Sequence, residues 1–139
     1  MPASYLYPDI KTVLTIHEQI LSISWEGGLR GMIDQWSIEK VLELVQNDVY
    51  YKALYEKISY LLYWLVMNHG FVDGNKRTAL GTTALFIWEN TQDIILTDKF
   101  LKKFENVVVD IASWNLSKNE LQKLVKFFLF SYLEENTAL

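Results

Sequence analysis

A chain of 139 residues that is 50% hydrophobic and 14% aromatic can bury a core, which argues against disorder and fits one domain over residues 1–139. It has no cysteine, which excludes disulfides and thiolate metal sites, and its formal net charge of −4 argues against direct nucleic-acid binding. Because it shows neither a signal-peptide pattern nor an uncharged apolar stretch of about 18 residues, we expect a soluble cytoplasmic protein without a membrane partner.

Apolar residues recur at helical spacing along most of the chain, and both prolines precede residue 9. This predicts an all-α fold of about six helices. The first helix is expected over residues 10–23, and Ser37 is the expected N-cap of the second. Residues 58–67 are apolar on all sides, and residues 75–90 nearly so, which predicts two central, buried helices.

The last third of the sequence predicts two further helices. Thr97 is expected to cap a helix that presents the apolar positions from Phe100 to Ile111 on one side, and the preceding DIIL is expected to be a short extended piece. Ser117 and Glu120 form a capping box at the start of the final helix.

The stretch HGFVDGNKR, residues 69–77, joins the two central helices and carries the clearest chemistry. The turn around Gly74 precedes a helix whose first backbone amides point back into the turn. Cations in a first helical turn cost roughly 0.3–1 kcal/mol each, so Lys76 and Arg77 are badly placed unless an anion binds there. Free amides and two cations together predict a phosphate site.

Other residues of the stretch supply the parts of a group-transfer site. A neutral His69 can accept a proton from a hydroxyl group, and Asp73 offers an oxygen ligand for Mg²⁺. The amide of Asn75 can donate to a phosphate oxygen. We expect Phe71 to anchor the loop in the core, and Gly74 to adopt a conformation that a side chain would resist.

Each of these residues also has a commoner, structural explanation. Asp73 and Asn75 are good N-caps, Lys76 and Arg77 resemble a solvated face, and a histidine at a helix end is often structural, as His69 would then be. Their coincidence within nine residues favours phosphoryl or nucleotidyl transfer.

The stretch resembles the signature of the Fic/Doc superfamily, H-x-F-x-[DE]-[GA]-N-x-R, and its N-K-R form resembles the Doc (death-on-curing) toxin branch. TIHEQI, GGLRGM and GNKRTAL occur in the same order as in Doc toxins. The resemblance implies a compact all-α fold around two central helices. It also implies roles for seven matching positions: His69, Phe71, Asp73, Gly74, Asn75, Lys76 and Arg77.

By this resemblance, His69 deprotonates the target hydroxyl, Asp73 holds Mg²⁺, and the loop from Gly74 to Arg77 binds the phosphates of ATP. Arg77 contacts a terminal phosphate, with Asn75 on a neighbouring one.

Two departures from AMP-transferring Fic proteins, Lys76 in place of glycine and Leu80 in place of a second arginine, favour a kinase that binds ATP reversed. Doc proteins of this kind transfer the γ-phosphate to a threonine of elongation factor Tu and arrest translation. AMP transfer and a catalytically inactive module that binds nucleotide or a partner remain as alternatives, and Gly70 leaves the rigidity of the loop open because many relatives carry proline there.

The resemblance also implies a small antitoxin, similar to Phd and itself DNA-binding, whose C-terminal segment lies in a groove of the toxin. Trp25, Trp36, Trp88 and Trp114 are candidates to line this groove, although burial in the core is the commoner role for each.

Four residues outside the motif are open to two interpretations. SYLEEN, with Ser131 and Glu135, fits a self-inhibitory pattern of some Fic proteins, but its arginine partner is absent, so we expect helix surface. His17 is expected to be structural, and Arg30 to contact substrate or brace a loop.

Overall fold

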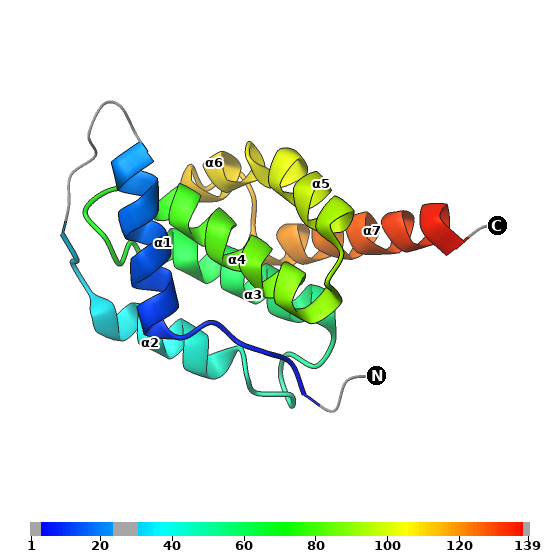
Figure 1. Cartoon of the computed structure of the whole chain (residues 1–139), viewed down its shortest axis with the longest axis horizontal. Coiled ribbons are helices and arrows are strands. Elements are labelled where there is room, and N and C mark those ends of the chain that lie inside the picture. The colour runs from blue at the N-terminus through cyan, green and yellow to red at the C-terminus, as the bar shows by residue number, and fades with distance from the viewer. Residues whose placement is uncertain (1–3, 24–30, 138–139) are drawn as a thin grey trace.

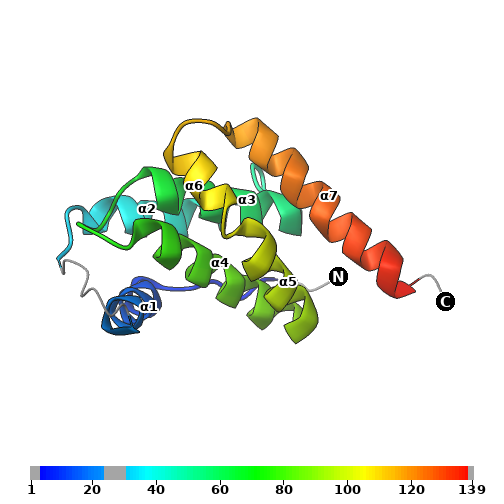
Figure 2. The ribbon, with the colours of Figure 1, turned by 90° about the horizontal axis from the view of Figure 1, so that it is seen from above.

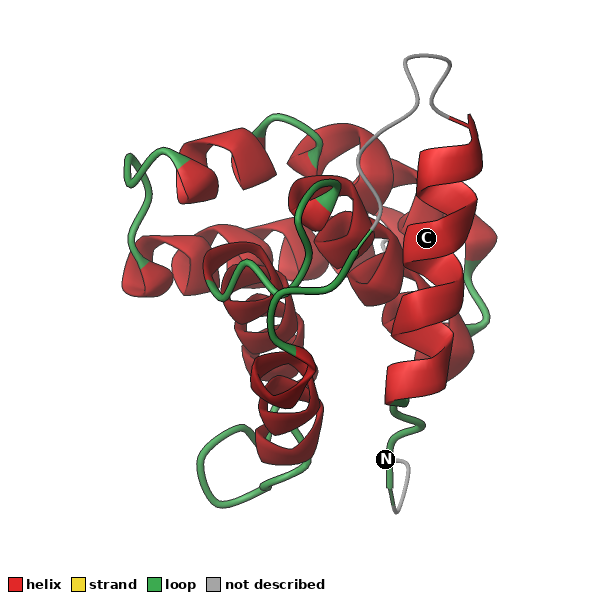
Figure 3. Ribbon diagram, turned by 90° about the vertical axis from the view of Figure 1, so that its left-hand side faces the viewer, coloured by secondary structure: helices red, strands yellow, loops and turns green. Residues whose placement is uncertain are grey.

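The structure, a computed structural model, describes residues 4–23 and 31–137. These ranges contain seven helices and no strand beyond an isolated bridge, which confirms the all-α prediction (Figure 3). None of the helices described combines the length and apolarity needed to cross a bilayer. The helices are α1 (Ile10–Ile23), α2 (Gln35–Leu44), α3 (Leu54–Met67), α4 (Asn75–Thr91), α5 (Ile94–Phe104), α6 (Val107–Ala112) and α7 (Lys118–Thr137).

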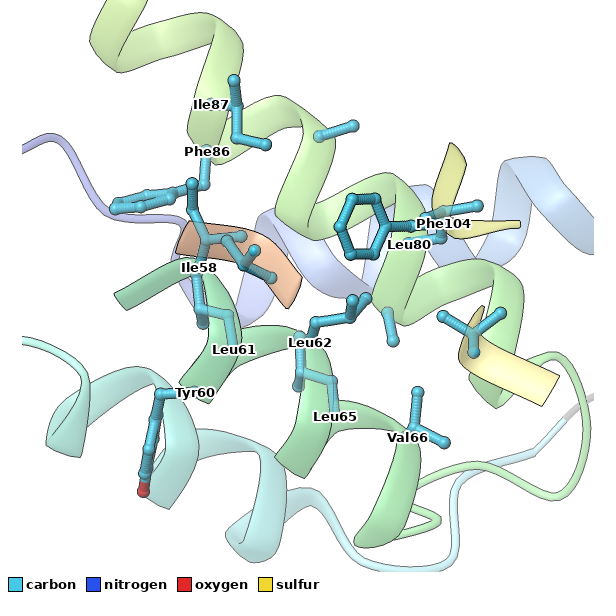
Figure 4. Packing of buried hydrophobic residues seen from close by; sticks show 14 of the residues in the cluster. Ile58, Tyr60, Leu61, Leu62, Leu65, Val66, Leu80, Phe86, Ile87 and Phe104 are labelled. Atoms are coloured by element: carbon cyan, nitrogen blue, oxygen red, sulfur yellow. The ribbon is translucent and has the colours of Figure 1, made fainter. Parts of the chain in front are cut away.

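The helices α3 and α4 form the centre of the molecule, as predicted (Figure 1). The first packs against α2, α4, α6 and α7, and the second against α1, α3, α5 and α6. Between them, Leu61 and Leu62 of α3 belong to the same buried cluster as Leu80 and Phe86 of α4 (Figure 4). The loop that joins the two helices is therefore held at both ends by the best-packed part of the fold. The core residues labelled in Figure 4 are Ile58, Tyr60, Leu61, Leu62, Leu65, Val66, Leu80, Phe86, Ile87 and Phe104.

The first helix, α1, packs against α4 at Gly81, a residue of α4 without a side chain. A Cβ atom on Gly81 would lie 3.2 Å from Cγ2 of Ile16, tighter than an ordinary van der Waals contact. The glycine thus permits the close approach of α1, and His17, the next residue after Ile16, is buried between α1 and the loop that precedes α4.

Helix α2 begins two residues earlier than its expected cap. Asp34 is the N-cap, and its carboxylate accepts a hydrogen bond of 3.1 Å from the amide of Ser37. The prediction that Ser37 caps this helix is therefore wrong. Ser37 is the third residue inside the helix, and its hydroxyl donates back to the carbonyl of Asp34 at 2.9 Å.

The segment after α4 differs from the prediction in three ways. Asp93 caps α5 by accepting from the amide of Leu96 at 3.0 Å, so DIIL enters a helix instead of an extended piece and Thr97 lies within it. The helix then ends at Phe104, and α6 follows as a seventh helix. The pattern concealed this break because Phe104 and Val108, on either side of it, are both buried at nearly helical spacing.

Helix α7 starts at the predicted capping box. The amide of Glu120 donates to the hydroxyl of Ser117 at 3.1 Å, and the amide of Ser117 donates to the Glu120 carboxylate at 2.9 Å. The helix runs along α3 on the side of the molecule away from α1 (Figure 2). It is tied to α5 by the hydroxyl of Tyr132, which donates to the Asp93 carboxylate at 2.8 Å. Its buried face consists of Leu121, Val125, Leu129 and Tyr132.

Candidate active site

The loop between α3 and α4 begins with a strained backbone at His69. Helix α3 ends at Met67, Asn68 is its C-cap, and His69 follows with a φ angle of 47°. This left-handed position after a helix is usually occupied by glycine, because a Cβ atom there costs about 1–2 kcal/mol. The imidazole of His69 is exposed at the surface. A strained, exposed histidine at this point is consistent with a role in binding or catalysis.

The first half of the loop is attached to the segment that leads into α2. The carbonyl of Gly70 accepts hydrogen bonds from the amides of Ile33 at 2.8 Å and Asp34 at 3.1 Å. The amide of Val72 donates to the carbonyl of Gly31 at 3.1 Å, within the antiparallel bridge between Met32 and Phe71. These backbone contacts hold the loop in place, and no side-chain pattern in the sequence predicts them.

Asn75, the first residue of α4, braces the loop from the other end. Its Oδ1 atom accepts from the amide of Phe71 at 3.0 Å, and its Nδ2 atom donates to the carbonyl of Phe71 at 2.8 Å. An amide NH₂ group has two hydrogens, so one donor of Asn75 remains for a ligand. The phenyl ring of Phe71 is buried, as expected from its place in the motif.

His17 of α1 contacts the loop through its imidazole ring. Its ring stacks on Phe71 with centroids 3.7 Å apart and an interplanar angle of 10°. Its Nε2 atom lies 2.7 Å from the carbonyl oxygen of Asp73, a distance that fits a donated hydrogen bond. His17 is thus structural, as expected, but its partner is the motif loop itself. The signal in the sequence was a histidine on the amphipathic first helix, within the segment TIHEQI that resembles Doc toxins.

The start of α4 has the features of an anion site. Gly74 adopts the left-handed conformation with φ 80° and has no side chain that could cap the helix. The amides of the first turn, from Asn75 to Arg77, therefore have no side-chain cap and are available to an external acceptor. The Asp73 carboxylate accepts from the amide of Gly74 at 2.7 Å and remains exposed.

The two cations of this turn have no protein counter-charge among the described residues. Lys76 and Arg77 are exposed, and neither forms an ion pair with a described carboxylate. Both lie at the positive end of the α4 dipole. The residues present therefore fit a phosphate group, which would accept from the amides and balance both side chains.

Asp73 is the motif residue that fits a divalent cation. No group of three or more His, Cys, Asp or Glu side chains within the described residues is arranged to hold a metal. A Mg²⁺ ion at Asp73 would therefore take most of its ligands from phosphate oxygens and water, as is usual for this ion with nucleotides. The loop thus places a potential base, a metal-type carboxylate and an anion site within nine residues of sequence.

The tryptophans singled out in the sequence differ in exposure. Trp36 is 66% exposed and Trp114 is 79% exposed, so burial in the core is wrong for both, whereas Trp88 is half-buried. Trp25 and Arg30 lie outside the described residues.

Ser131 and Glu135 are on α7, where Glu135 pairs with Lys99 at 3.8 Å; this confirms the expected surface role. Leu80 faces the core, consistent with the absence of a second arginine there.

Comparison with known proteins covers the part of the chain that contains this loop. The model of the Fic/DOC family matches residues 7–87, from the segment before α1 to most of α4. The chain is also similar to the protein kinase doc of Escherichia phage P1, with 36% identity over 81 residues. That match covers 56% of this chain and 63% of the phage protein, less than two thirds of its length.

Proposed function

Because the chain belongs to the Fic/DOC family, we propose that it transfers the γ-phosphate of ATP to a hydroxyl group of a protein. One observation supports this more than any other. The uncapped first turn of α4, with Lys76 and Arg77, which pair with no carboxylate of the described residues, adjoins the same short loop as the exposed His69. Phosphate binding and proton abstraction are thereby available at one surface.

In the proposed reaction, His69 takes the proton from the hydroxyl group of the target protein. The hydroxyl oxygen forms a bond to the γ-phosphorus, and the bond from that phosphorus to the bridging oxygen breaks, so that ADP leaves with the electron pair. The amides after Gly74, with Lys76 and Arg77, stabilise the negative charge on the transferring group. Asp73 would hold Mg²⁺, which neutralises phosphate charge during the transfer.

Two features support phosphate transfer over AMP transfer. Lys76 stands where AMP-transferring Fic proteins have glycine, and its long side chain occupies space beside the phosphate site. Leu80, which is buried in the core, stands where those proteins have the second arginine. The similarity to the phage protein kinase doc points in the same direction.

The proposal includes the biological role of a toxin in a toxin–antitoxin pair. Its target is elongation factor Tu, whose modification in the cytoplasm arrests translation. Its partner is a small Phd-like antitoxin encoded beside it. Both follow from the resemblance of the N-K-R motif to Doc toxins and from the similarity to the phage protein.

Labelled ATP separates the possible activities. The purified protein is incubated with elongation factor Tu, Mg²⁺ and ATP labelled at either the α- or the γ-phosphate. Label retained from the γ-position alone supports the kinase, whereas label retained from the α-position means AMP transfer. Saturable ATP binding without label on any protein of a cell lysate means a binding module.

Variants test whether the motif loop performs the transfer. We expect His69→Ala to abolish it, because the imidazole is the proposed base and the other proton acceptor of the loop, Asp73, is proposed to hold Mg²⁺. The matched control is Val72→Ala, which shortens another exposed side chain of the same loop and should leave transfer unchanged. Transfer at the wild-type rate by His69→Ala would refute the mechanism.

A further inference from the structure

The outward face of α7 carries two exposed phenylalanines. Phe127 is 71% exposed and Phe130 is 49% exposed, and the helical period places both opposite the buried face of the helix, although one edge contact joins Phe130 to Tyr55 of α3 with ring centroids 6.2 Å apart. Lys123 and Glu134 continue the same row, because the spacing of four, three and four residues follows the helical period. We call these four residues, Lys123, Phe127, Phe130 and Glu134, the outer α7 stripe. They line a surface hollow of about 340 Å³ together with Lys126 and Ser131.

The order of the charges along the outer α7 stripe is complementary to the same stripe running in the opposite direction. Lys123 lies four residues before Phe127, and Glu134 lies four residues after Phe130. If a second copy of the helix is laid antiparallel across it, each Lys123 meets Glu134 of the other copy. Each Phe127 then meets Phe130 of the other copy at the centre. A twofold axis requires this kind of self-complementary surface.

We propose that the outer α7 stripe is a self-association surface, on which a second copy of this chain packs with its α7 antiparallel. Neither Lys123 nor Glu134 forms an ion pair with a described residue, although Lys123 contributes to the lowered pKa of the Glu120 carboxyl on the same helix, whereas Glu135 is already paired with Lys99. The exposed aromatic rings supply the apolar contact, and the two ion pairs at the ends set the direction and register.

The position of α7 permits such a dimer without blocking the motif loop. The helix has 20 residues and is about 30 Å long by its rise per residue. It lies outside residues 7–87, and its C-terminal half extends beyond the rest of the molecule (Figures 1 and 2). One helix pair buries a small interface, so association in the micromolar range is expected. The inference does not depend on the proposed activity.

Charge reversal tests the pairing directly by sedimentation velocity between roughly 10 and 300 μM, a range set by micromolar affinity. Lys123→Glu and Glu134→Lys should each raise the dissociation constant at least about tenfold, because each places like charges at both ends of the interface. An equimolar mixture of the two variants should dimerise again, since every contact then joins a lysine to a glutamate. The double variant should also dimerise by itself.

Two further variants separate the surface from folding. Phe127→Ser should yield a monomer with an unchanged melting temperature, because the side chain is largely exposed. Lys11→Glu, on α1, makes the same charge change away from α7 and should leave the dimer unaffected.

Three results would overturn the proposal. These are a wild-type protein that is monomeric at every concentration, a dimer that is insensitive to Lys123→Glu, and a mixture of the charge variants that stays monomeric. A stripe protected from hydrogen exchange only when the antitoxin is bound would identify the antitoxin as its occupant and would equally exclude the dimer.

Discussion

The Nε2 atom of His17 lies 2.7 Å from the carbonyl oxygen of Asp73, so a side chain of α1 holds the loop that precedes α4. The same ring stacks on Phe71. His17 therefore acts on the site through the backbone of the loop, as a positioning residue. This contact joins residues 56 positions apart and explains why α1 belongs to the proposed active site.

We expect His17→Phe to separate the two contacts. Phenylalanine keeps a ring on Phe71 but leaves the Asp73 carbonyl without its donor, which should cost about 1–3 kcal/mol in free energy of unfolding. If the loop loses its geometry, the kcat of phosphate transfer should fall at least about tenfold with a smaller change in the KM for ATP. Denaturant unfolding and steady-state kinetics measure both effects. Wild-type kcat in this variant would show that the contact does not position the loop.

His69→Gly should make the protein more stable and inactive at once. Glycine relieves the left-handed backbone at φ 47°, which should raise the free energy of unfolding by about 1 kcal/mol. The same change removes the proposed base. His69→Ala is the comparison, since it removes the imidazole but keeps a Cβ atom and should not gain this stability. Thermal unfolding and γ-label transfer are the measurements, and an active His69→Gly variant would contradict the proposed role of the imidazole.

Lys76→Gln and Arg77→Gln should weaken ATP binding while they stabilise the free protein. Each removes a cation from the first turn of α4, where it opposes the helix dipole by roughly 0.3–1 kcal/mol. Calorimetric titration with ATP and Mg²⁺ measures the affinity, which should also fall with ionic strength. Lys102→Gln is the matched control: it lies in the last turn of α5, where a cation is favourable, so stability should fall slightly and ATP affinity should not change.

Asp93 should make the fold sensitive to acid. Hydrogen bonds from the amide of Leu96 and the hydroxyl of Tyr132 lower the pKa of its carboxyl. The contribution of the ionised Asp93 to the free energy of unfolding is present above the pKa of the unfolded carboxyl, about 3.9. It is lost as the pH falls through the lower pKa of the folded state. Asp93→Asn keeps a capping side chain without charge, so its melting temperature should approach that of the wild type below about pH 4. A constant difference from pH 7 to pH 2.5 would contradict this.

Gly70 should tolerate a side chain only if Ile38 makes room for it. A Cβ atom on Gly70 would clash with the Cδ1 and Cγ1 atoms of Ile38. Gly70→Ala is therefore expected to cost about 1–3 kcal/mol by overpacking, and Ile38→Ala about 2–5 kcal/mol by leaving a cavity. The double variant should lose clearly less than the sum, because the methyl group enters the cavity. Additive losses in denaturant unfolding would show that the two residues do not compete for space.

The accuracy of the sequence predictions depended on how local the relevant contacts were. The bounds of α1, the start of α4 and the capping box at Ser117 were predicted correctly, because periodicity and capping depend on neighbouring residues. The break after Phe104 and the cap at Asp34 were missed. At the start of α2, the local sequence allowed a cap at Asp34 or at Ser37, and at the end of α5 it allowed the helix to stop at Phe104 or to continue. The packing of α2 and α5 selected one alternative in each place.

The exposed tryptophans show the same limit. Trp36 and Trp114 are large and apolar, which favours burial on average, but composition does not say which side of a helix or turn faces the core. Trp36 lies in the first turn of α2, and Trp114 follows α6 with a φ angle of 64°. Trp36 is exposed because it lies on the side of α2 opposite Ile38, Val41 and Leu42, which are buried.

Local chemistry was sufficient to define the motif loop: a turn at Gly74, a helix start with two misplaced cations, and a histidine before it. Each depends on residues within nine positions of each other, and the family match is consistent with them. The packing of distant segments determined the rest, namely the His17 contact from α1, the bonds of Gly70 to the start of α2, and the exposed stripe on α7. Such contacts depend on how whole helices pack, because burial is a property of the assembled core and not of any one segment.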